Sequence, residues 1–295
     1  MFFTSVNYEE PVFRPPAEAY SAIIQATIGC AWNKCAFCEM YTMKKFRLKK
    51  WEELQPEIGK LARCYKSAKK IFLADGNTLV LSASRLVPIL EEINKQFGRI
   101  QRISSYALPK DIAAKSHGEL LRLRSLGLKL LYIGIESGND ELLKAINKGE
   151  THQSTIEGIN KAHDAGIDTS IMVINGLGGK KYSKNHALDS AKLVSKINPK
   201  FLSVLTLSFP MGEAHYTNRF KGDYMPQTIV ELVEELKTFV ENLHIQNTIF
   251  RTDHVSNNFV LKGTFPKDKN GFVDQIEEII KNTNPGDYPV CSPVL

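Results

Sequence analysis

The feature that most constrains the fold is an alternation of short apolar runs with longer segments whose apolar residues recur every three or four positions. Short runs of this kind are typical of buried strands, and the longer segments are typical of amphipathic helices. The predicted strands are 22–28, 70–74, 102–107, 129–135, 169–174, 201–207 and 248–252. The predicted helices include 51–65, 83–97, 110–126, 151–165, 185–197 and 229–243. The alternation predicts an α/β fold, a partial (β/α)6 to (β/α)7 parallel barrel.

The composition is that of a folded protein with a large core. Hydrophobic residues make up 43% of the 295 positions and the net charge is only +6, which excludes an intrinsically disordered chain. We expect residues 21–260 to form the barrel, 1–20 an N-terminal extension, and 261–295 a C-terminal helix and tail. No uncharged apolar run approaches the ~20 residues that cross a bilayer, and the acidic N-terminus differs from a signal peptide, so we expect a cytoplasmic protein.

Three of the five cysteines, Cys30, Cys35 and Cys38, follow the first predicted strand with the spacing C-x4-C-x2-C. In a reducing compartment such clustering indicates metal binding. Three thiolates can hold three irons of a [4Fe–4S] cluster and leave the fourth iron open to another ligand. A zinc site is the alternative, although structural zinc takes four ligands and no second cysteine pair completes it. Of the remaining cysteines, Cys64 is expected in the core, and Cys291 in the tail as a surface thiol or a hydrogen-atom donor.

Polar residues and glycines follow several of the predicted strands. The segments are 75–77 after the second strand, 136–138 after the fourth, and 175–179 after the fifth. Ligands of parallel α/β folds bind at the carboxyl ends of the strands, so these segments are expected to share one mouth with the cysteine loop. Two alternatives stay open. Ser137 and Asp140 also fit a helix capping box, and residues 175–179 also fit an ordinary strand-to-helix connection.

The cysteine loop, with Phe37 just before its third cysteine, resembles that of the radical S-adenosylmethionine (radical SAM) superfamily. The resemblance covers residues 20–260. Residues 75–77 stand where the family carries a Gly-Gly-Glu turn, and 133–138 match its fourth-strand pattern. Residues 139–149 resemble coproporphyrinogen-dehydrogenase-like and Elongator-like members. The chain departs from the common pattern by one extra residue in the cysteine loop and by Asn77 where glutamate is usual.

The resemblance implies a set of cofactor-binding residues. The metal ligands would be Cys30, Cys35 and Cys38, which would hold a [4Fe–4S] cluster whose open iron binds the amino and carboxylate groups of SAM. The main chain of Phe37 and the turn at Asn175 would contact the adenine. The backbone carbonyls of Asp75, Gly76 and Asn77 would face the methionine ammonium, and the Asn77 amide carbonyl could also accept from it. Glu136 or Ser137 would bond the ribose hydroxyls.

The activity implied by the resemblance is reductive cleavage of SAM to a 5′-deoxyadenosyl radical that abstracts hydrogen from a substrate. With two cysteines left over and no additional domain, a second cluster and cobalamin are disfavoured. We expect a small or medium polar substrate, including anionic metabolites. The alternatives are an enzyme that modifies tRNA or another nucleic acid and, in another class, a non-catalytic iron–sulfur or zinc protein.

Residues outside the cofactor site are the candidates for substrate and partner contacts. Arg251 and His254 at the end of the last strand, and Tyr106 after the third, could contact the substrate, because arginine suits carboxylate or phosphate and histidine exchanges protons near neutral pH. The alternative is a surface salt bridge between Arg251 and Asp253 beside a satisfied histidine. Residues 44–50 hold five cations in seven positions, which fits a solvated face or a docking patch for an acidic flavodoxin or ferredoxin. A nucleic-acid footprint is weak.

Overall fold

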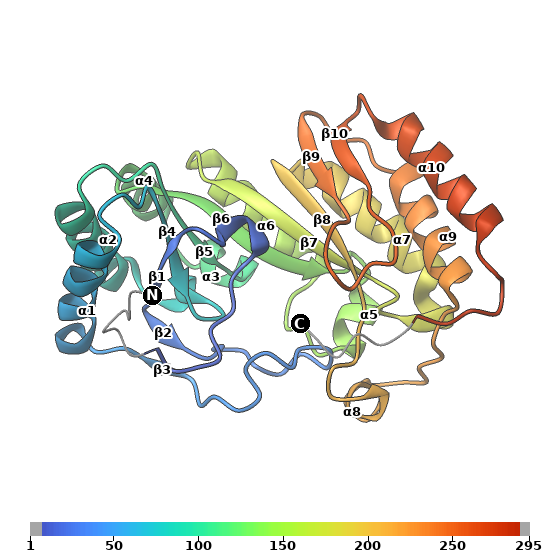
Figure 1. Cartoon of the computed structure of the whole chain (residues 1–295), viewed down its shortest axis with the longest axis horizontal. Coiled ribbons are helices and arrows are strands. Elements are labelled where there is room, and N and C mark those ends of the chain that lie inside the picture. The colour runs from blue at the N-terminus through green and yellow to red at the C-terminus, as the bar shows by residue number, and fades with distance from the viewer. Residues whose placement is uncertain (1–7, 290–295) are drawn as a thin grey trace. The chain divides into compact units, whose positions relative to one another are not determined.

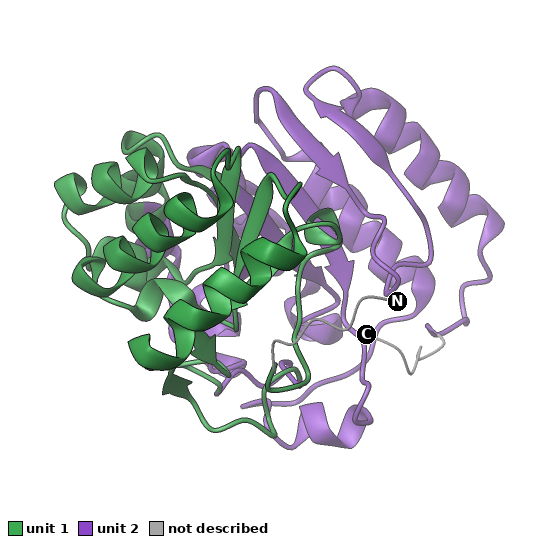
Figure 2. Cartoon of the chain, turned by 60° about the vertical axis from the view of Figure 1, so that its left-hand side comes forward, with its two compact units in different colours: residues 1–33, 40–133, 157–169 green, residues 34–39, 134–156, 170–295 purple. Residues whose placement is uncertain are grey.

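The computed structural model describes residues 8–289, which belong to two compact units (Figure 2). Unit 1 takes in the chain up to residue 33 together with 40–133 and 157–169. Unit 2 takes in residues 34–39, 134–156 and the chain from 170 onward.

Unit 1 is built on parallel strands covered by helices (Figure 1). The strand order is β1 (Ala22–Gln25), β4 (Lys70–Ala74), β5 (Arg102–Tyr106) and β6 (Leu128–Glu136), each parallel to the next. The last three residues of β6 belong to unit 2. The helices are α1 (Trp51–Cys64), α2 (Ala83–Phe97), α3 (Pro109–Ala113), α4 (His117–Ser125) and most of α6 (His152–Asp164). The short strands β2 (Thr27–Ile28) and β3 (Arg47–Leu48) form a separate antiparallel pair, and the 3₁₀ helices η1 (Pro16–Glu18) and η2 (Thr78–Val80) complete the unit.

Hydrophobic periodicity explains the helices of unit 1. In α1, Leu54, Ile58 and Leu61 are buried at three- and four-residue steps, so one face packs inward. The segment predicted as one helix over 110–126 is two helices, because Ser116 caps α4 in a capping box with Glu119.

The strands of unit 2 are most of β7 (Asp168–Asn175) together with β8 (Phe201–Thr206), β9 (Thr248–Arg251) and β10 (Lys262–Phe265). β7, β8 and β9 are parallel, and β10 is antiparallel to β9. Its helices are α5 (Asp140–Ala145), α7 (Gly179–Ile197), α8 (Glu213–Thr217), α9 (Ile229–Glu241) and α10 (Lys269–Asn282). α9 packs against both α7 and α10 (Figure 1).

The α/β class and the parallel strand arrangement are confirmed, and each of the seven predicted strands is present. Two details differ. The first predicted strand divides, because its end forms β2 and pairs with β3 instead of continuing β1. β10 was not predicted, and it brings part of the expected C-terminal segment into register with β9, Lys262 opposite Arg251. The expected domain boundaries stay predictions, and Cys291 lies outside the described residues.

Over residues 8–289, no helix is both long enough and apolar enough to cross a membrane.

Candidate functional site

In unit 1, the Asp75 carboxylate anchors the start of the cysteine loop. Its Oδ2 accepts hydrogen bonds from the main-chain N–H of Gly29 (2.9 Å), from Lys44 Nζ (2.9 Å) and from Gln25 Nε2 (3.1 Å). The side chain is fully buried. The Oδ2 atom thus ties β4 to the start of the cysteine loop, and the contact of the Asp75 backbone carbonyl with a ligand stays a prediction.

Gly76 lies against Cys30. Its N–H donates to the carbonyl of Gly29 (3.2 Å), and a Cβ at this position would lie 2.8 Å from Cys30 Cβ and 2.7 Å from the Tyr41 ring. Any larger residue would collide, so glycine lets the end of β4 approach the first cysteine this closely.

Asn77, the next residue, carries an unsatisfied polar atom. Its side chain is completely buried, and its Nδ2 donates to Asp111 Oδ2 on α3. Its Oδ1 is buried with no hydrogen-bond partner. An unpaired buried acceptor costs about 1–3 kcal/mol, so its presence marks a place where a donor can bind. An ammonium group fits this acceptor.

In unit 2, the other two cysteines lie near a buried ion pair. Lys148 Nζ is 2.9 Å from Glu136 Oε1 and 5.8 Å from the centre of the Phe37 ring. Burial lowers the pKa of Lys148, but Glu136 together with the thiols of Cys35 and Cys38 outweighs burial and raises that pKa above its ordinary value. Lys148 therefore keeps a positive charge beside the cysteine loop.

The structure distinguishes the two residues predicted to bind the ribose. Glu136 has a left-handed backbone with φ of 64°, a strained conformation that is common at functional sites. Ser137 is fully buried and bonds His186 Nδ1 on α7 (2.8 Å). The capping-box alternative for Ser137 is wrong, since α5 is capped by Asn139, whose side chain accepts from Leu142 N. Glu136 is the better candidate for a ligand contact.

His186 belongs to a buried network that sequence reasoning missed. Its Nε2 lies 3.0 Å from the carbonyl of Ile174, which can only accept, so Nε2 carries the proton in the neutral ring and Nδ1 accepts from Ser137. Nε2 is also 3.6 Å from Glu235 Oε1, which accepts from Gly176 N (2.7 Å). The network joins the turns after β6 and β7. His186 and Glu235 lie inside helices and have no local sequence signal.

The Asn175 side chain faces α9. Its Nδ2 donates to the carbonyl of Leu232 (2.8 Å), and a Cβ on Gly176 would lie 2.5 Å from Leu232 Cδ2. Packing against α9 thus explains the Asn175 side chain and the glycine at position 176. This agrees with the alternative that residues 175–179 are an ordinary strand-to-helix connection. A main-chain contact with adenine stays a prediction.

Arg251 is exposed at the end of β9. Its neighbour Phe250 is buried against Phe272 of α10, with ring centres 5.3 Å apart. Because side chains alternate along a strand, Arg251 lies on the sheet face opposite α10. Asp253 pairs with Lys262 (3.0 Å) rather than with Arg251, so the alternative salt bridge does not form.

His254 and Tyr106 are each engaged within their own unit. His254 Nδ1 accepts from the main-chain N–H of Ser256 (3.2 Å), and burial lowers the His254 pKa. In unit 1 the Tyr106 ring packs edge-to-face on Phe72, with centres 5.2 Å apart. Their substrate contacts stay predictions.

The basic run is largely neutralised within unit 1. Lys44 pairs with Asp75, Arg47 pairs with Glu9 and Glu53, and Lys49 pairs with Glu57. Lys45 and Lys50 remain exposed. The run is therefore a weaker docking patch than its composition predicts.

The expectation that Cys64 is a core residue is wrong, because Cys64 is exposed.

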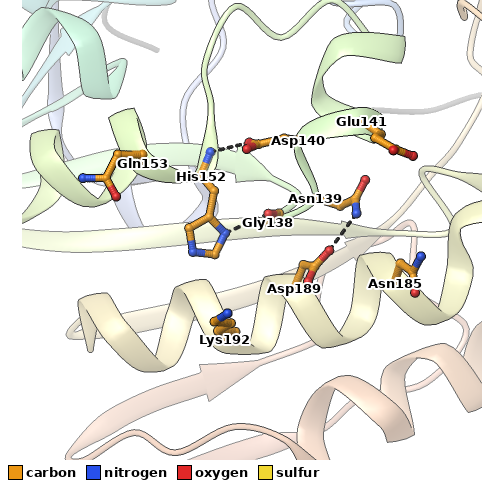
Figure 3. A pocket seen from close by; sticks show the side chains of 9 residues that line it. All are labelled: Gly138, Asn139, Asp140, Glu141, His152, Gln153, Asn185, Asp189 and Lys192. Carbon is orange, nitrogen blue, oxygen red and sulfur yellow. Dashed lines mark hydrogen bonds between the residues drawn. The ribbon is translucent and has the colours of Figure 1, made fainter.

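A pocket of about 470 Å³ opens on unit 2 between the turn after β6, the start of α6 and α7 (Figure 3). Its nine lining residues are Gly138, Asn139, Asp140, Glu141, His152, Gln153, Asn185, Asp189 and Lys192. Asn139 Nδ2 donates to Asp189 Oδ2 (2.6 Å) across one wall. No predicted cluster, SAM or substrate residue lines this pocket, so it is not the predicted site.

Among residues 8–289, no three His, Cys, Asp or Glu side chains are arranged to hold a metal ion. The ligand set therefore rests on the spacing of the cysteine loop and on family membership. The model of the radical SAM superfamily matches residues 24–194, more than half of the chain. The chain belongs to the radical SAM superfamily. It is thus an enzyme that uses a [4Fe–4S] cluster and SAM, which sets aside the zinc and non-catalytic alternatives.

Similarity to individual relatives is low. The tRNA-2-methylthio-N(6)-dimethylallyladenosine synthase of Chlorobium phaeobacteroides is 26% identical over 174 residues, which is 57% of this chain and 38% of that protein. The chain spans about a third of the length of the curated relatives it matches.

Among solved structures, coproporphyrinogen III oxidase of Escherichia coli is similar with a TM-score of 0.57 at 17% identity, covering 75% of this chain and 52% of that one. Methylornithine synthase has a TM-score of 0.51 at 15% identity and covers 92% of this chain and 82% of that one. At such identities the likeness shows the fold alone.

Proposed function

We propose that this radical SAM enzyme removes a hydrogen atom from a small or medium polar metabolite that carries an anionic group. The observation that carries the SAM site is the buried, unpartnered Oδ1 of Asn77, one residue from the glycine that packs against Cys30. A ligand ammonium would satisfy this acceptor, and the amino group of SAM is such a donor.

The residues of each unit have definite parts in this proposal. Cys30, Cys35 and Cys38 would hold the cluster. When bound, the cluster and SAM supply one electron and a primary carbon radical able to attack an unactivated C–H bond. Glu136 would accept from the ribose hydroxyls, with its carboxylate held by Lys148 at 2.9 Å.

The anionic character of the substrate is inferred from the end of β9. Arg251 and Lys262 stand directly opposite each other in the β9–β10 ladder, so their side chains share one face of the sheet. Like charges in opposite positions are unfavourable, and Asp253 offsets only the Lys262 charge. An anion bound at Arg251 would offset the positive charge of that residue. The guanidinium group of arginine suits a carboxylate or a phosphate. Tyr106 and His254 remain candidates for further substrate contacts.

Modification of tRNA is the rival proposal. It is favoured by the Chlorobium relative, which is named a tRNA-modifying synthase. The internal ion pairs of the basic run speak against it, because they leave fewer cations for phosphates. RNA binding that weakens steeply with salt would favour this rival.

The test is anaerobic reconstitution with iron and sulfide, followed by reduction in the presence of SAM. We expect 5′-deoxyadenosine and methionine, with an increase on addition of the true substrate from a panel of polar carboxylates and phosphates. A protein that carries its full iron complement but forms no 5′-deoxyadenosine would contradict the proposal. In a cell, we expect cytoplasmic location and an acidic electron donor.

A further inference from the structure

We infer that Asp111 is a positioning residue for SAM recognition: it orients the Asn77 amide so that Oδ1 faces the methionine ammonium, and it supplies the negative charge that position 77 lacks. The inference rests on the proposed function and deepens it. It concerns which residue of unit 1 makes the ammonium subsite selective.

Asp111 decides which atom of the Asn77 amide faces the ligand. The Nδ2 of Asn77 donates to Asp111 Oδ2, while Oδ1 stays buried and unpartnered. A flipped amide would place Oδ1 against a carboxylate oxygen, and two acceptors repel. The carboxylate therefore holds the amide in the one orientation that presents an acceptor to a ligand cation.

Lys115 keeps Asp111 in place. Its Nζ donates to the main-chain carbonyl of Asp111 (3.1 Å) and to that of Leu79 in η2, just after Asn77. Lys115 is buried, and Ile112 on α3 is fully buried. The short helix that carries Asp111 is thus tied to the same turn that carries Asn77, so the two side chains are fixed relative to each other.

The pair also explains why an amide stands at position 77. A carboxylate there would face the Asp111 carboxylate, and two adjacent carboxylates disfavour the doubly ionised state. With an amide, the single negative charge lies one hydrogen bond behind the acceptor and polarises it. The negative charge that the family's usual glutamate provides is thereby moved to α3.

The experiment compares four iron-loaded proteins under anaerobic conditions: unmodified, Asp111→Asn, Asn77→Asp, and the double variant Asn77→Asp/Asp111→Asn. Affinity is measured by calorimetry for SAM and for 5′-methylthioadenosine, which lacks the amino-acid part. Glu119→Gln is the matched control, because it removes one acidic charge from the first turn of the neighbouring α4, and glutamine still fits the capping box.

We expect Asp111→Asn to weaken SAM binding roughly tenfold, equivalent to ~1.4 kcal/mol, with little change for 5′-methylthioadenosine, iron content or the control. Asn77→Asp alone should also weaken SAM binding, because the new carboxylate would face the carboxylate of Asp111. The double variant exchanges the two groups without changing their size, so it should restore SAM affinity to within about threefold of the unmodified protein, ~0.65 kcal/mol.

Three results would overturn the inference. They are an Asp111→Asn effect equal to that of the control, equal losses for SAM and 5′-methylthioadenosine, and no recovery in the double variant. If Asp111→Asn does not fold, Asn77→Asp alone tests the inference. The inference expects weaker SAM binding by this variant. Tighter binding would mean that any added negative charge attracts the ammonium, and that would contradict the inference. If the unmodified protein binds no SAM, the proposed function fails and the inference falls with it.

Discussion

Replacing Lys148 with methionine should strongly destabilise unit 2. Lys148 and Glu136 form an ion pair at 2.9 Å whose side chains are only 5% and 9% exposed. The substitution Lys148→Met keeps the length of the side chain but leaves the Glu136 carboxylate buried without its cation. Breaking a buried pair in this way costs about 3–5 kcal/mol, a large share of the 5–15 kcal/mol that typically stabilises a domain.

The assay is chemical denaturation of the iron-loaded protein under anaerobic conditions, with the free energy of unfolding compared between variants. Lys180→Met is the matched control, because Lys180 pairs with Glu231 at a similar distance, 2.8 Å, but on the surface of the same unit, where it should change stability little. Lys148→Met/Glu136→Gln should recover much of the loss, since no buried charge is then left unpaired. The reasoning is refuted if Lys148→Met and Lys180→Met lower the free energy of unfolding by the same small amount.

Three further outcomes are expected. Changing Cys30, Cys35 or Cys38 to alanine should abolish the iron content of about four per chain expected for one [4Fe–4S] cluster, measured by iron assay and visible absorbance, whereas Cys64→Ala should leave it unchanged. Arg251→Ala should leave iron and substrate-free SAM cleavage intact while turnover of the true substrate is lost; loss of iron would instead mean a structural role. Burial lowers the pKa of His163, so the folded state binds fewer protons than the unfolded state, and stability should be highest above the unfolded pKa of about 6.5 and fall as the pH drops towards the lower folded value. His163→Gln should reduce that fall in denaturation midpoints measured from pH 7.5 to 5, and an unchanged dependence would contradict it.

Local patterns predicted the elements that carry the site. Strand-length apolar runs identified the parallel strands. A strand such as 70–74 is buried along most of its length, and a buried strand of a parallel sheet is apolar. β10 escaped prediction because it is short and its burial is partial. The sequence predicts one helix over 110–126, but residues 115–119 carry no apolar side chain and Ser116 caps a second helix there.

The cysteine spacing and the strand-end motifs also predicted the family, because both are patterns of residues that are close together in the sequence. That Cys30, Cys35 and Cys38 hold the cluster stays a prediction. Side-chain partners are different. Asn77 bonds Asp111, 34 positions away, and Ser137 bonds His186, 49 positions away. The carboxylate of Asp75 accepts a hydrogen bond from Lys44, 31 positions earlier, a partner that the sequence did not predict.

The tertiary structure alone decided these partners. A hydrogen bond or ion pair forms only where folding brings a donor within about 3 Å of an acceptor, and nothing in the local sequence around α3 or α7 marks Asp111 or His186 as neighbours of the strand ends. Residue type and period set which segments become strands and helices, because those depend on contacts a few residues apart. Three features depend instead on which strands and helices become neighbours, and that is settled only when the whole core packs. They are the orientation of the Asn77 amide, the hydrogen bond of Ser137 to His186, and the ion pairs of residues 44–50.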